Sequence, residues 1–379
     1  MSVWIGAGSF NQYLAAALQE LNAKHFFIIA DEPACTRSGA KAILAEQVPS
    51  HATVWFSDFT PNPRLEDVER AVSTCRQAIG SEVEELAIIA VGGGTAIDLA
   101  KLTAAAVQQP GVLPLWKSGR TAIEEPVTRL LAIPTTAGTG SEATPIAVVY
   151  IHGVKHSLEH ASLLPGTVIV DSLLTASLPP SVAAATGLDC LCQAIESLWS
   201  VRATDSSRAD AWEALQLAVE YLVPVVKCPT AESREAMSRA AHLAGRAIGV
   251  SRTTAAHALS YHLTSQYGVP HGMAVAIFLG PLLVYNSQIT DEDCQDPRGA
   301  GSVRQVIQQI CGQFGAADAR LAAQRWNQML INLAVPSRLE DVGVQTSAAR
   351  QQLARSANLA RLSNNPRRLT EQAILDWFV

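Results

Sequence analysis

Four side chains in the second half of the sequence have the chemistry of a metal site. Asp189 and Gln193 are four residues apart, so a helix places both on one face. His257 lies on a later helical stretch, and His271 follows a turn at residues 268–270 that can fold it back. One carboxylate, one amide oxygen and two imidazoles suit Fe²⁺ or Zn²⁺. The alternative is that all four are hydrogen-bonded polar groups of a core.

A triple-glycine turn in the first half of the sequence predicts a phosphate site. The turn of Gly92, Gly93 and Gly94 follows an expected strand and leads into a helix from Thr95. Glycines let the backbone approach a phosphate closely, and the start of a helix offers N–H groups and a positive dipole end. The run is not the G-x-G-x-x-G fingerprint, so a tight turn without a ligand is the alternative.

A second turn and one carboxylate add to this cofactor site. The turn at residues 134–142 follows another expected strand and is rich in hydroxyl groups, on Thr135, Thr136, Thr139 and Ser141. Asp31 ends the strand expected at residues 25–30, where its carboxylate can bond ribose hydroxyls and repel a 2′-phosphate. The alternative for Asp31 is a helix N-cap. We therefore expect a nicotinamide dinucleotide here, NAD(H) rather than NADP(H).

The elements that must position these residues change type near residue 180. Before it, strands are expected at residues 25–30, 53–56, 86–91 and 130–133, and helices at 11–23, 64–79 and 95–107. This alternation predicts an α/β dinucleotide-binding domain with a parallel, Rossmann-like sheet at residues 1–179. The following sequence is rich in Ala and Leu with helical periodicity, which predicts an all-α metal-binding and substrate domain at residues 180–379.

Composition argues against several other classes of protein. The 379 residues are 48% hydrophobic and 16% charged, typical of a compact fold, and the net charge of −6 does not favour nucleic acid. The longest uncharged apolar stretch, residues 272–285, is shorter than the roughly 20 residues of a membrane span and reads as a buried helix. Seven scattered cysteines without a C-x-x-C pair indicate reduced thiols. We expect a cytoplasmic protein without a signal peptide, with a small-molecule substrate, and compatible with a homodimer.

In their order along the chain, these motifs resemble those of the iron-containing (group III) alcohol dehydrogenases. The resemblance spans nearly the whole chain. The matching segments are GGGTAID at 92–98 with Lys101, PTTAGTGSE at 134–142, GLD at 187–189, AIE at 194–196, PHG at 270–272, PNP at 61–63 and NNPRRLT at 364–370. The resemblance implies a dinucleotide-binding α/β domain followed by an all-helical domain. It also implies NAD(P)H-dependent reduction of a small aldehyde to a primary alcohol at a metal.

Carried over by position, the family's metal ligands fall on Asp189, Gln193, His257 and His271. Gln193 is a departure, because the family usually has a histidine there and an amide oxygen is a weaker donor. Tyr261 is a second departure, at a position where many members carry a histidine near the substrate. Tyr261 is a candidate proton relay, and a packed core tyrosine is the alternative.

The remaining carried-over positions concern the cofactor and the substrate. Asp98 and Lys155 match positions lining the cofactor site, and Lys155 is also a candidate catalytic residue that could meet phosphate charge. Around Gln193 and residues 256–264 the chain is most similar to phosphonoacetaldehyde reductases, which form 2-hydroxyethylphosphonate. A phosphonate demands a cation, preferably a bidentate arginine, and Arg252 is the candidate. An ordinary surface arginine is the alternative.

Three other functions stay open. The chain could be an iron-dependent alcohol dehydrogenase for a different small alcohol or aldehyde. It could be one of the related dehydroquinate-synthase-like lyases, although TAIDLAK at 95–101 favours the dehydrogenases, and net NADH consumption would separate the two. It could also be a metal-free relative with only a binding role, which metal analysis beside an NAD(P)H-oxidation assay would identify.

Overall fold

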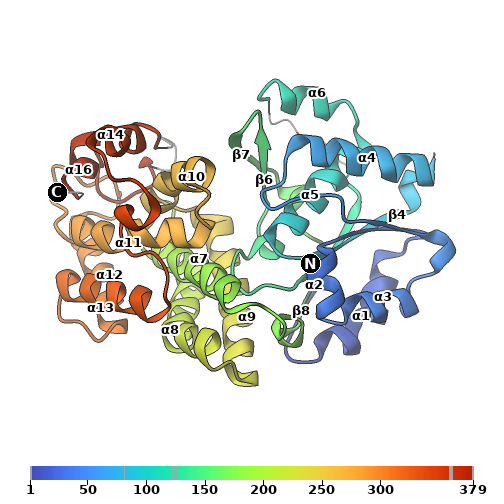
Figure 1. Cartoon of the computed structure of the whole chain (residues 1–379), viewed down its shortest axis with the longest axis horizontal. Helices are drawn as coiled ribbons and strands as arrows, with labels where there is room; N and C mark the ends of the chain where they lie inside the picture. The colour runs from blue at the N-terminus through green and yellow to red at the C-terminus, as the bar shows by residue number, and fades with distance from the viewer. Residues whose placement is uncertain (1, 81, 121–122, 124–126, 358–361, 378–379) are drawn as a thin grey trace. The chain divides into compact units, whose positions relative to one another are not determined.

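The computed structural model describes residues 2–80, 82–120, 123, 127–357 and 362–377 (Figure 1). It divides into two compact units, Met1–Leu178 and Pro179–Val379, which we call the α/β unit and the helical unit. The division falls at the Leu178-Pro-Pro180 segment, where the composition changes.

A six-stranded parallel sheet forms the centre of the α/β unit, in the order β1-β8-β5-β4-β2-β3. Its strands are β1 (Ser2–Ile5), β2 (His25–Ala30), β3 (Thr53–Phe56), β4 (Leu86–Gly92), β5 (Arg129–Pro134) and β8 (Thr167–Val170). Every residue of β4 is buried, because helices cover both faces of the sheet. The α/β fold with a parallel sheet is therefore confirmed.

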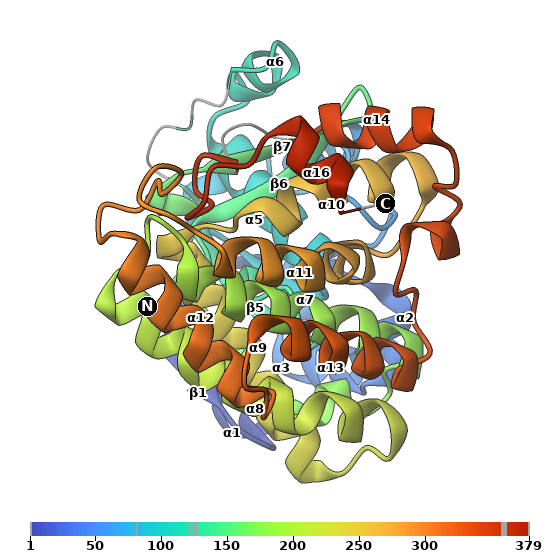
Figure 2. The same ribbon diagram turned by 90° about the vertical axis from the view of Figure 1, so that its left-hand side faces the viewer.

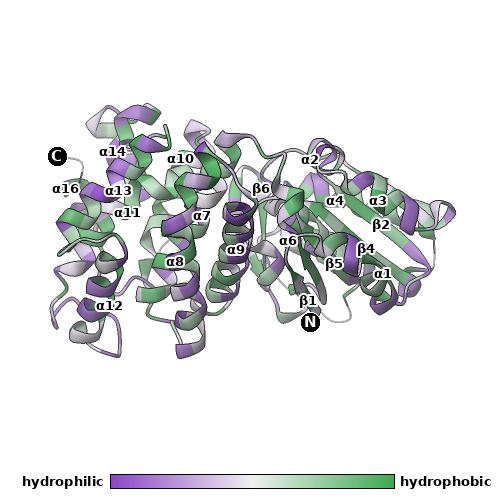
Figure 3. Cartoon of the chain, turned by 90° about the horizontal axis from the view of Figure 1, so that it is seen from below, coloured by the Kyte–Doolittle hydropathy of each residue, from purple (hydrophilic) through white to green (hydrophobic). Residues whose placement is uncertain are grey.

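Helices cover this sheet on two sides. The helices are α1 (Ser9–Leu21), α2 (Glu32–Arg37), α3 (Ala40–Gln47), α4 (Leu65–Ile79), α5 (Gly94–Gln108) and α6 (Val112–Lys117). One apolar core joins α4, α5 and α6 to the side chains of Phe27 and Ile88, and a second joins α1 and α3 to those of Phe26 and Ile89. Neighbouring strand residues thus face opposite cores, and the hydrophobic colour along the strands in Figure 3 follows from this double burial.

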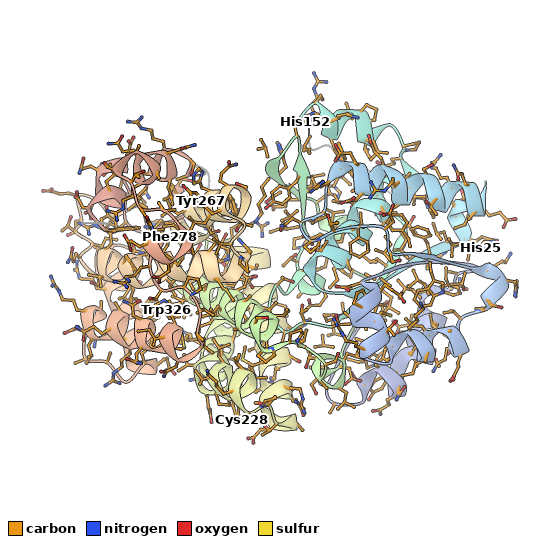
Figure 4. The ribbon with its side chains drawn as sticks, viewed as in Figure 1. His25, His152, Cys228, Tyr267, Phe278 and Trp326 are labelled. Carbon is orange, nitrogen blue, oxygen red and sulfur yellow. The ribbon has the colours of Figure 1, made fainter. Side chains whose placement is uncertain are left out.

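An antiparallel hairpin, which the sequence analysis did not predict, completes the α/β unit. Its strands are β6 (Ile146–Ile151) and β7 (Val154–Glu159), which form a separate two-stranded sheet, and Tyr150 of β6 also makes an isolated parallel bridge with Arg64. His152, labelled in Figure 4, lies in the connecting turn with a φ of 51°. The pattern along β6 alternates between half-buried and buried residues, which is the signature of a strand with one covered face.

The second unit is helical throughout its described elements, as predicted. Its helices are α7 (Pro180–Trp199), α8 (Asp205–Lys227), α9 (Ala231–Ser251), α10 (Ala255–Tyr267), α11 (His271–Ser287), α12 (Ala300–Gln313), α13 (Ala319–Asn332), α14 (Ser347–Arg355) and α16 (Glu371–Asp376). Helix α7 packs against α8, α9 and α11, and α11 packs against α10 and α13 (Figure 2). The buried helix expected at residues 272–285 lies within α11, where Trp326 of α13 donates its indole N–H to the carbonyl of Ala276 at 3.0 Å.

Two further observations concern thiols and membranes. All seven cysteines are free thiols, and five of them are buried. Across the part of the chain that the structure describes, no helix is both long enough and apolar enough to cross a bilayer.

Candidate metal and cofactor sites

Three of the four predicted metal ligands converge in the helical unit. Asp189 of α7, His257 of α10 and His271 of α11 each offer one ligand atom, and these atoms all lie within 4.8 Å of one another. Asp189 and His257 are buried, and His271 is half-buried. The His257 Nε2 atom lies 3.2 Å from Asp189 Oδ1. A carboxylate and two imidazoles at this spacing fit a divalent transition metal.

The helix boundaries explain how His271 reaches this cluster. Gly268 ends α10 in the left-handed conformation, with a φ of 67°. Pro270 precedes the first residue of α11, so His271 occupies the N-terminus of that helix. The turn at residues 268–270 thus reverses the chain and sets His271 beside His257, with ring centroids 5.5 Å apart.

Gln193 lies one helical turn after Asp189 on α7, next to the metal cluster. Its Nε2 donates a hydrogen bond to Asp189 Oδ2 at 3.1 Å, and the side chain is buried. The four-residue spacing therefore places both side chains on one face. In this arrangement the amide nitrogen, rather than the oxygen, faces the carboxylate.

A buried carboxylate absent from the predicted site, Glu196, contacts the second nitrogen of His257. Its Oε2 is hydrogen-bonded to His257 Nδ1, and its Oε1 accepts from Thr254 Oγ1 at 2.6 Å and from the backbone N–H of Ala256 at 2.8 Å. Burial alone would lower the pKa of His257, but the charges of Glu196 and Asp189 raise that pKa to about 9. Sequence reasoning placed Glu196 in a motif without giving it a role.

Tyr261 contacts the cluster, whereas Arg252 contacts the end of α9. Tyr261 is half-buried on α10 and stacks on His271, with ring centroids 6.1 Å apart. Arg252 follows α9 with a φ of 62° and is buried. Its Nη1 donates to the carbonyls of Ile248, at 3.0 Å, and of Gly249, so the guanidinium caps the end of α9. Arg252 is thus a buried residue, and not the surface arginine of the alternative interpretation.

In the α/β unit, the two small-residue turns lie against each other. A Cβ on Gly93 would be 3.2 Å from the Thr136 methyl group, and one on Gly94 would be 2.8 Å from the side chain of Thr139. Such spacing leaves no room for larger side chains, and helix α5 begins directly at Gly94. The glycine turn and the hydroxyl-rich turn therefore form one surface of backbone and hydroxyl groups.

Two further groups border the glycine turn. Asp31 is beside it, because a Cβ on Gly92 would be 3.0 Å from the Asp31 Cβ. Asp31 also caps α2, accepting from the N–H of Ala34 at 3.2 Å, so the N-cap alternative is observed and the ribose contact stays a prediction. Asn62, from the PNP segment, donates its backbone N–H to Thr95 Oγ1 at 3.3 Å. This contact joins an early motif to the glycine turn, and the sequence analysis did not identify it.

Asp98 and Lys101 tie the hydroxyl-rich turn to α5. The Asp98 carboxylate accepts from Ser141 Oγ and from the N–H of Val148, and the buried Lys101 Nζ donates to the carbonyls of Ser141 and Thr144 at 2.6 and 2.8 Å. Burial raises the pKa of Asp98, which Lys101 and the half-buried Lys155 of β7 oppose, and burial lowers the pKa of Lys101 to about 8. The side chains of Asp98 and Lys101 thus hold the hydroxyl-rich turn against α5 through buried hydrogen bonds.

The predicted residues therefore fall into two groups. Those of the cofactor site surround the glycine turn in the α/β unit, and those of the metal site surround Asp189 in the helical unit. Lys155 neighbours the first group and Tyr261 belongs to the second.

Family models match both units of the chain. The model of the iron-containing alcohol dehydrogenases matches residues 2–172, and that of the C-terminal part of the Fe-containing alcohol dehydrogenase family matches residues 183–378. Together they span both groups of residues described above.

Individual relatives agree with the family models. The chain is 36% identical over 322 residues to a phosphonoacetaldehyde reductase of Streptomyces viridochromogenes, covering 82% of this chain and 79% of that one. It is 35% identical over 293 residues to long-chain-alcohol dehydrogenase 1 of Geobacillus thermodenitrificans, covering 75% and 71%. A crystal structure of sulfoacetaldehyde reductase from Bifidobacterium kashiwanohense in complex with NAD⁺ is 26% identical, with a TM-score of 0.86 over 100% of this chain and 96% of that one. The chain belongs to the iron-containing alcohol dehydrogenase family, and it is a metal-dependent, NAD(P)-linked aldehyde/alcohol oxidoreductase.

Proposed function

We propose that this enzyme reduces phosphonoacetaldehyde to 2-hydroxyethylphosphonate with NADH, at a metal held by Asp189, Gln193, His257 and His271. The observation that carries the metal site is the convergence of a buried carboxylate and two imidazoles from three helices. Fe²⁺ is the expected metal, with Zn²⁺ as the alternative, because both accept this donor set. Gln193 would complete it through its amide oxygen.

The bound groups and the protein have separate tasks in this reaction. A bound metal supplies a Lewis acid for the carbonyl oxygen, and a bound nicotinamide supplies the hydride for the carbonyl carbon. Asp189 and His257, both buried, hold their ligand atoms in a water-poor environment. Tyr261, which stacks on His271, would pass a proton from solvent to the product oxygen. The aldehyde thus gains one hydride and one proton.

The glycine turn and the hydroxyl-rich turn are the proposed cofactor site. Its residues are Asp31, Gly92, Gly93, Gly94, Thr95, Asp98, Thr135, Thr136, Thr139, Ser141 and Lys155. The backbone at the start of α5 would meet the pyrophosphate, because N–H groups and the helix dipole favour an anion there. In the described contacts, Asp98 supports Ser141, and Lys155 adds positive charge near Asp98.

Removing the charge of Asp31 should relax a preference for NADH over NADPH roughly tenfold or more. Two like charges about 4 Å apart repel each other by about 1 kcal/mol in bulk water and by about 4 kcal/mol near a protein surface. Asp31→Asn keeps a side-chain oxygen for the Ala34 cap, and Asp31→Gly removes the side chain. Both should shift the ratio of kcat/KM for the two cofactors. A clear NADPH preference in the unaltered enzyme would show that other residues around the ribose decide.

An anionic substrate is supported by two relatives. The phosphonoacetaldehyde reductase and the sulfoacetaldehyde reductase are both named for two-carbon aldehydes that carry a strongly acidic group. We expect kcat/KM for phosphonoacetaldehyde to exceed that for propanal at least ten- to a hundredfold, because a fixed cation can position the carbonyl through the remote phosphonate. The measurement is NADH oxidation with each aldehyde. Equal values, or faster reduction of propanal and longer aldehydes, would support an alcohol dehydrogenase for uncharged substrates, such as the Geobacillus relative.

Arg252 is the proposed cation, and replacing it distinguishes binding of the phosphonate from capping of α9. A charge-assisted contact is worth roughly 1.5–3 kcal/mol, so Arg252→Ala should lower kcat/KM for phosphonoacetaldehyde about ten- to a hundredfold and spare propanal. Arg246→Ala is the matched control, since Arg246 lies on α9, the helix that Arg252 caps, and pairs with Asp210. Equal losses on both aldehydes would mean that Arg252 only caps α9.

A further inference from the structure

One buried carboxylate of the helical unit, Glu196, contacts a proposed metal ligand without being a ligand itself. Its side chain is fully buried, and it lies on α7 two turns after Asp189. Its Oε2 meets His257 Nδ1, while His257 Nε2 faces Asp189 Oδ1 at 3.2 Å. The two ring nitrogens therefore have separate partners. Nδ1 meets Glu196 outside the metal cluster, and Nε2 meets Asp189 within the cluster.

The chemistry of this contact decides which nitrogen can bind a metal. An ionised carboxylate only accepts hydrogen bonds, so the neutral His257 ring must carry its proton on Nδ1 when it faces Glu196. Nε2 then carries no proton, and its lone pair points into the cluster beside Asp189, where it can bind a metal. In metal sites, a carboxylate on the second ring nitrogen fixes the tautomer and the ring orientation.

The remaining contacts of Glu196 hold the carboxylate itself in place. Its Oε1 accepts from Thr254 Oγ1 at 2.6 Å and from the N–H of Ala256 at 2.8 Å, which is near the start of α10. Trp199 in turn donates its indole N–H to Thr254 Oγ1 at 3.1 Å. With two donors on one oxygen and the imidazole on the other, the carboxylate cannot turn without losing a buried hydrogen bond.

We propose that Glu196 is a positioning residue that fixes the Nδ1–H tautomer of His257 and thereby sets the metal affinity of the cluster. The inference rests on the proposed metal site. A positioning role and a packing role of Glu196 predict different effects of substitution, because Gln and Asp differ from Glu in opposite ways. Glu196→Gln keeps the size but puts an N–H₂ donor in the site, whereas Glu196→Asp keeps an acceptor-only carboxylate but removes a methylene.

The test is which of the two variants, Glu196→Gln or Glu196→Asp, loses more metal affinity. With the side-chain oxygen still accepting from Thr254 and Ala256, the amide nitrogen introduced by Glu196→Gln would face Nδ1 and favour the Nε2–H tautomer, which cannot bind metal through Nε2. We expect Glu196→Gln to weaken Co²⁺ and Zn²⁺ binding about ten- to a hundredfold, and Glu196→Asp to weaken it less. A packing role predicts the reverse order, with the isosteric Glu196→Gln variant closer to wild type.

The experiment measures Kd by competition with a chelator, beside the Tm of each metal-free protein. Ser197→Ala is the matched control, because it removes a buried hydrogen bond between Ser197 Oγ and Ser251 Oγ at 2.8 Å on the same helix and leaves the hydrogen bonds of Glu196 and His257 in place. It should lower Tm with little change in Kd. Nitrogen-15 NMR of the His257 ring gives an independent readout, with Nδ1–H expected in zinc-loaded wild type and lost in Glu196→Gln.

The failures of the two proposals are distinguishable. Affinity that follows Tm across all three variants, or an Nε2–H ring in zinc-loaded wild type, would overturn the positioning role of Glu196 alone. A wild-type protein that binds no metal through His257 would overturn the proposed metal site, and the role of Glu196 with it.

Discussion

Replacing His271 with alanine should remove most of the metal affinity and lower kcat/KM for aldehyde reduction by about three orders of magnitude or more. Among the described residues, His271 is one of three His and Asp side chains that converge in the cluster. Lewis-acid stabilisation is worth several kcal/mol, and each 1.36 kcal/mol corresponds to a tenfold change in rate. Metal content and NADH oxidation of the purified variant provide the measurement, and cofactor binding should change little, because the glycine turn lies in the other unit.

His262→Ala is the matched control for this variant. His262 lies on the same helix as His257, but its ring packs near Tyr267, with centroids 5.8 Å apart, and it is outside the cluster. The control should keep its metal and most of its activity. If His271→Ala kept full activity, or if both variants lost it alike, the assignment of His271 as a ligand would be wrong.

Gly272→Ala should damage both folding and the metal site. A Cβ at this position would be 1.9 Å from the Ala185 carbonyl oxygen and 2.8 Å from the Asp189 backbone nitrogen. Both are backbone atoms of α7, so α11 and α7 must move apart where they carry His271 and Asp189. Overpacking of a core typically costs about 1–3 kcal/mol and occasionally more. We expect the upper end of this range, with metal affinity reduced at least about tenfold.

The control for this substitution is a glycine with free space around it. Gly301 lies in α12, and a Cβ there would meet no atom within 4 Å. Gly301→Ala should be neutral or slightly stabilising, because alanine favours a helix by about 1 kcal/mol over glycine. Thermal melting and metal titration compare the two variants. Wild-type Tm and Kd for Gly272→Ala would contradict the close approach of α7 and α11.

Four of the six strands of the sheet were predictable because the local sequence carries their signal, whereas β1 and β8 were not predicted. The continuous apolar run of β4 indicated a strand buried on both faces, and the glycines after it indicated the turn. The β6–β7 hairpin was missed, although β6 alternates between half-buried and buried residues. That alternation reflects a covered face that only the folded unit provides, so the sequence alone gave a weaker signal there.

The candidate metal site was partly predictable for a different reason. The four-residue spacing of Asp189 and Gln193 is a local property of one helix, and it placed them on one face. The approach of His257 and His271 depended on a turn that the glycine and proline at its ends indicated. The contact of Glu196 with His257 joins residues 61 apart in the sequence, and no helical or strand period reports such a pairing.

The buried charge of Lys101 could not have been foreseen from composition. A lysine on a helix is usually expected at the surface, yet Lys101 is fully buried and donates to three backbone carbonyls of the segment that contains Ser141 and Thr144. Its place is set by the carbonyl groups of Ser141, Thr144 and Ile146, which accept hydrogen bonds from Lys101 Nζ. Only the path of that loop, a tertiary feature, determines it.

Titration of metal into chelator-treated wild-type protein tests the central claim most directly, with bound metal and NADH-dependent aldehyde reduction measured on the same samples. If the reaction depends on the metal, the stripped enzyme should still bind NADH but reduce no aldehyde. Activity should return in proportion to Fe²⁺ bound at the cluster of Asp189, His257 and His271, up to about one ion at that cluster. Full aldehyde reduction by the stripped enzyme would contradict this dependence on the metal.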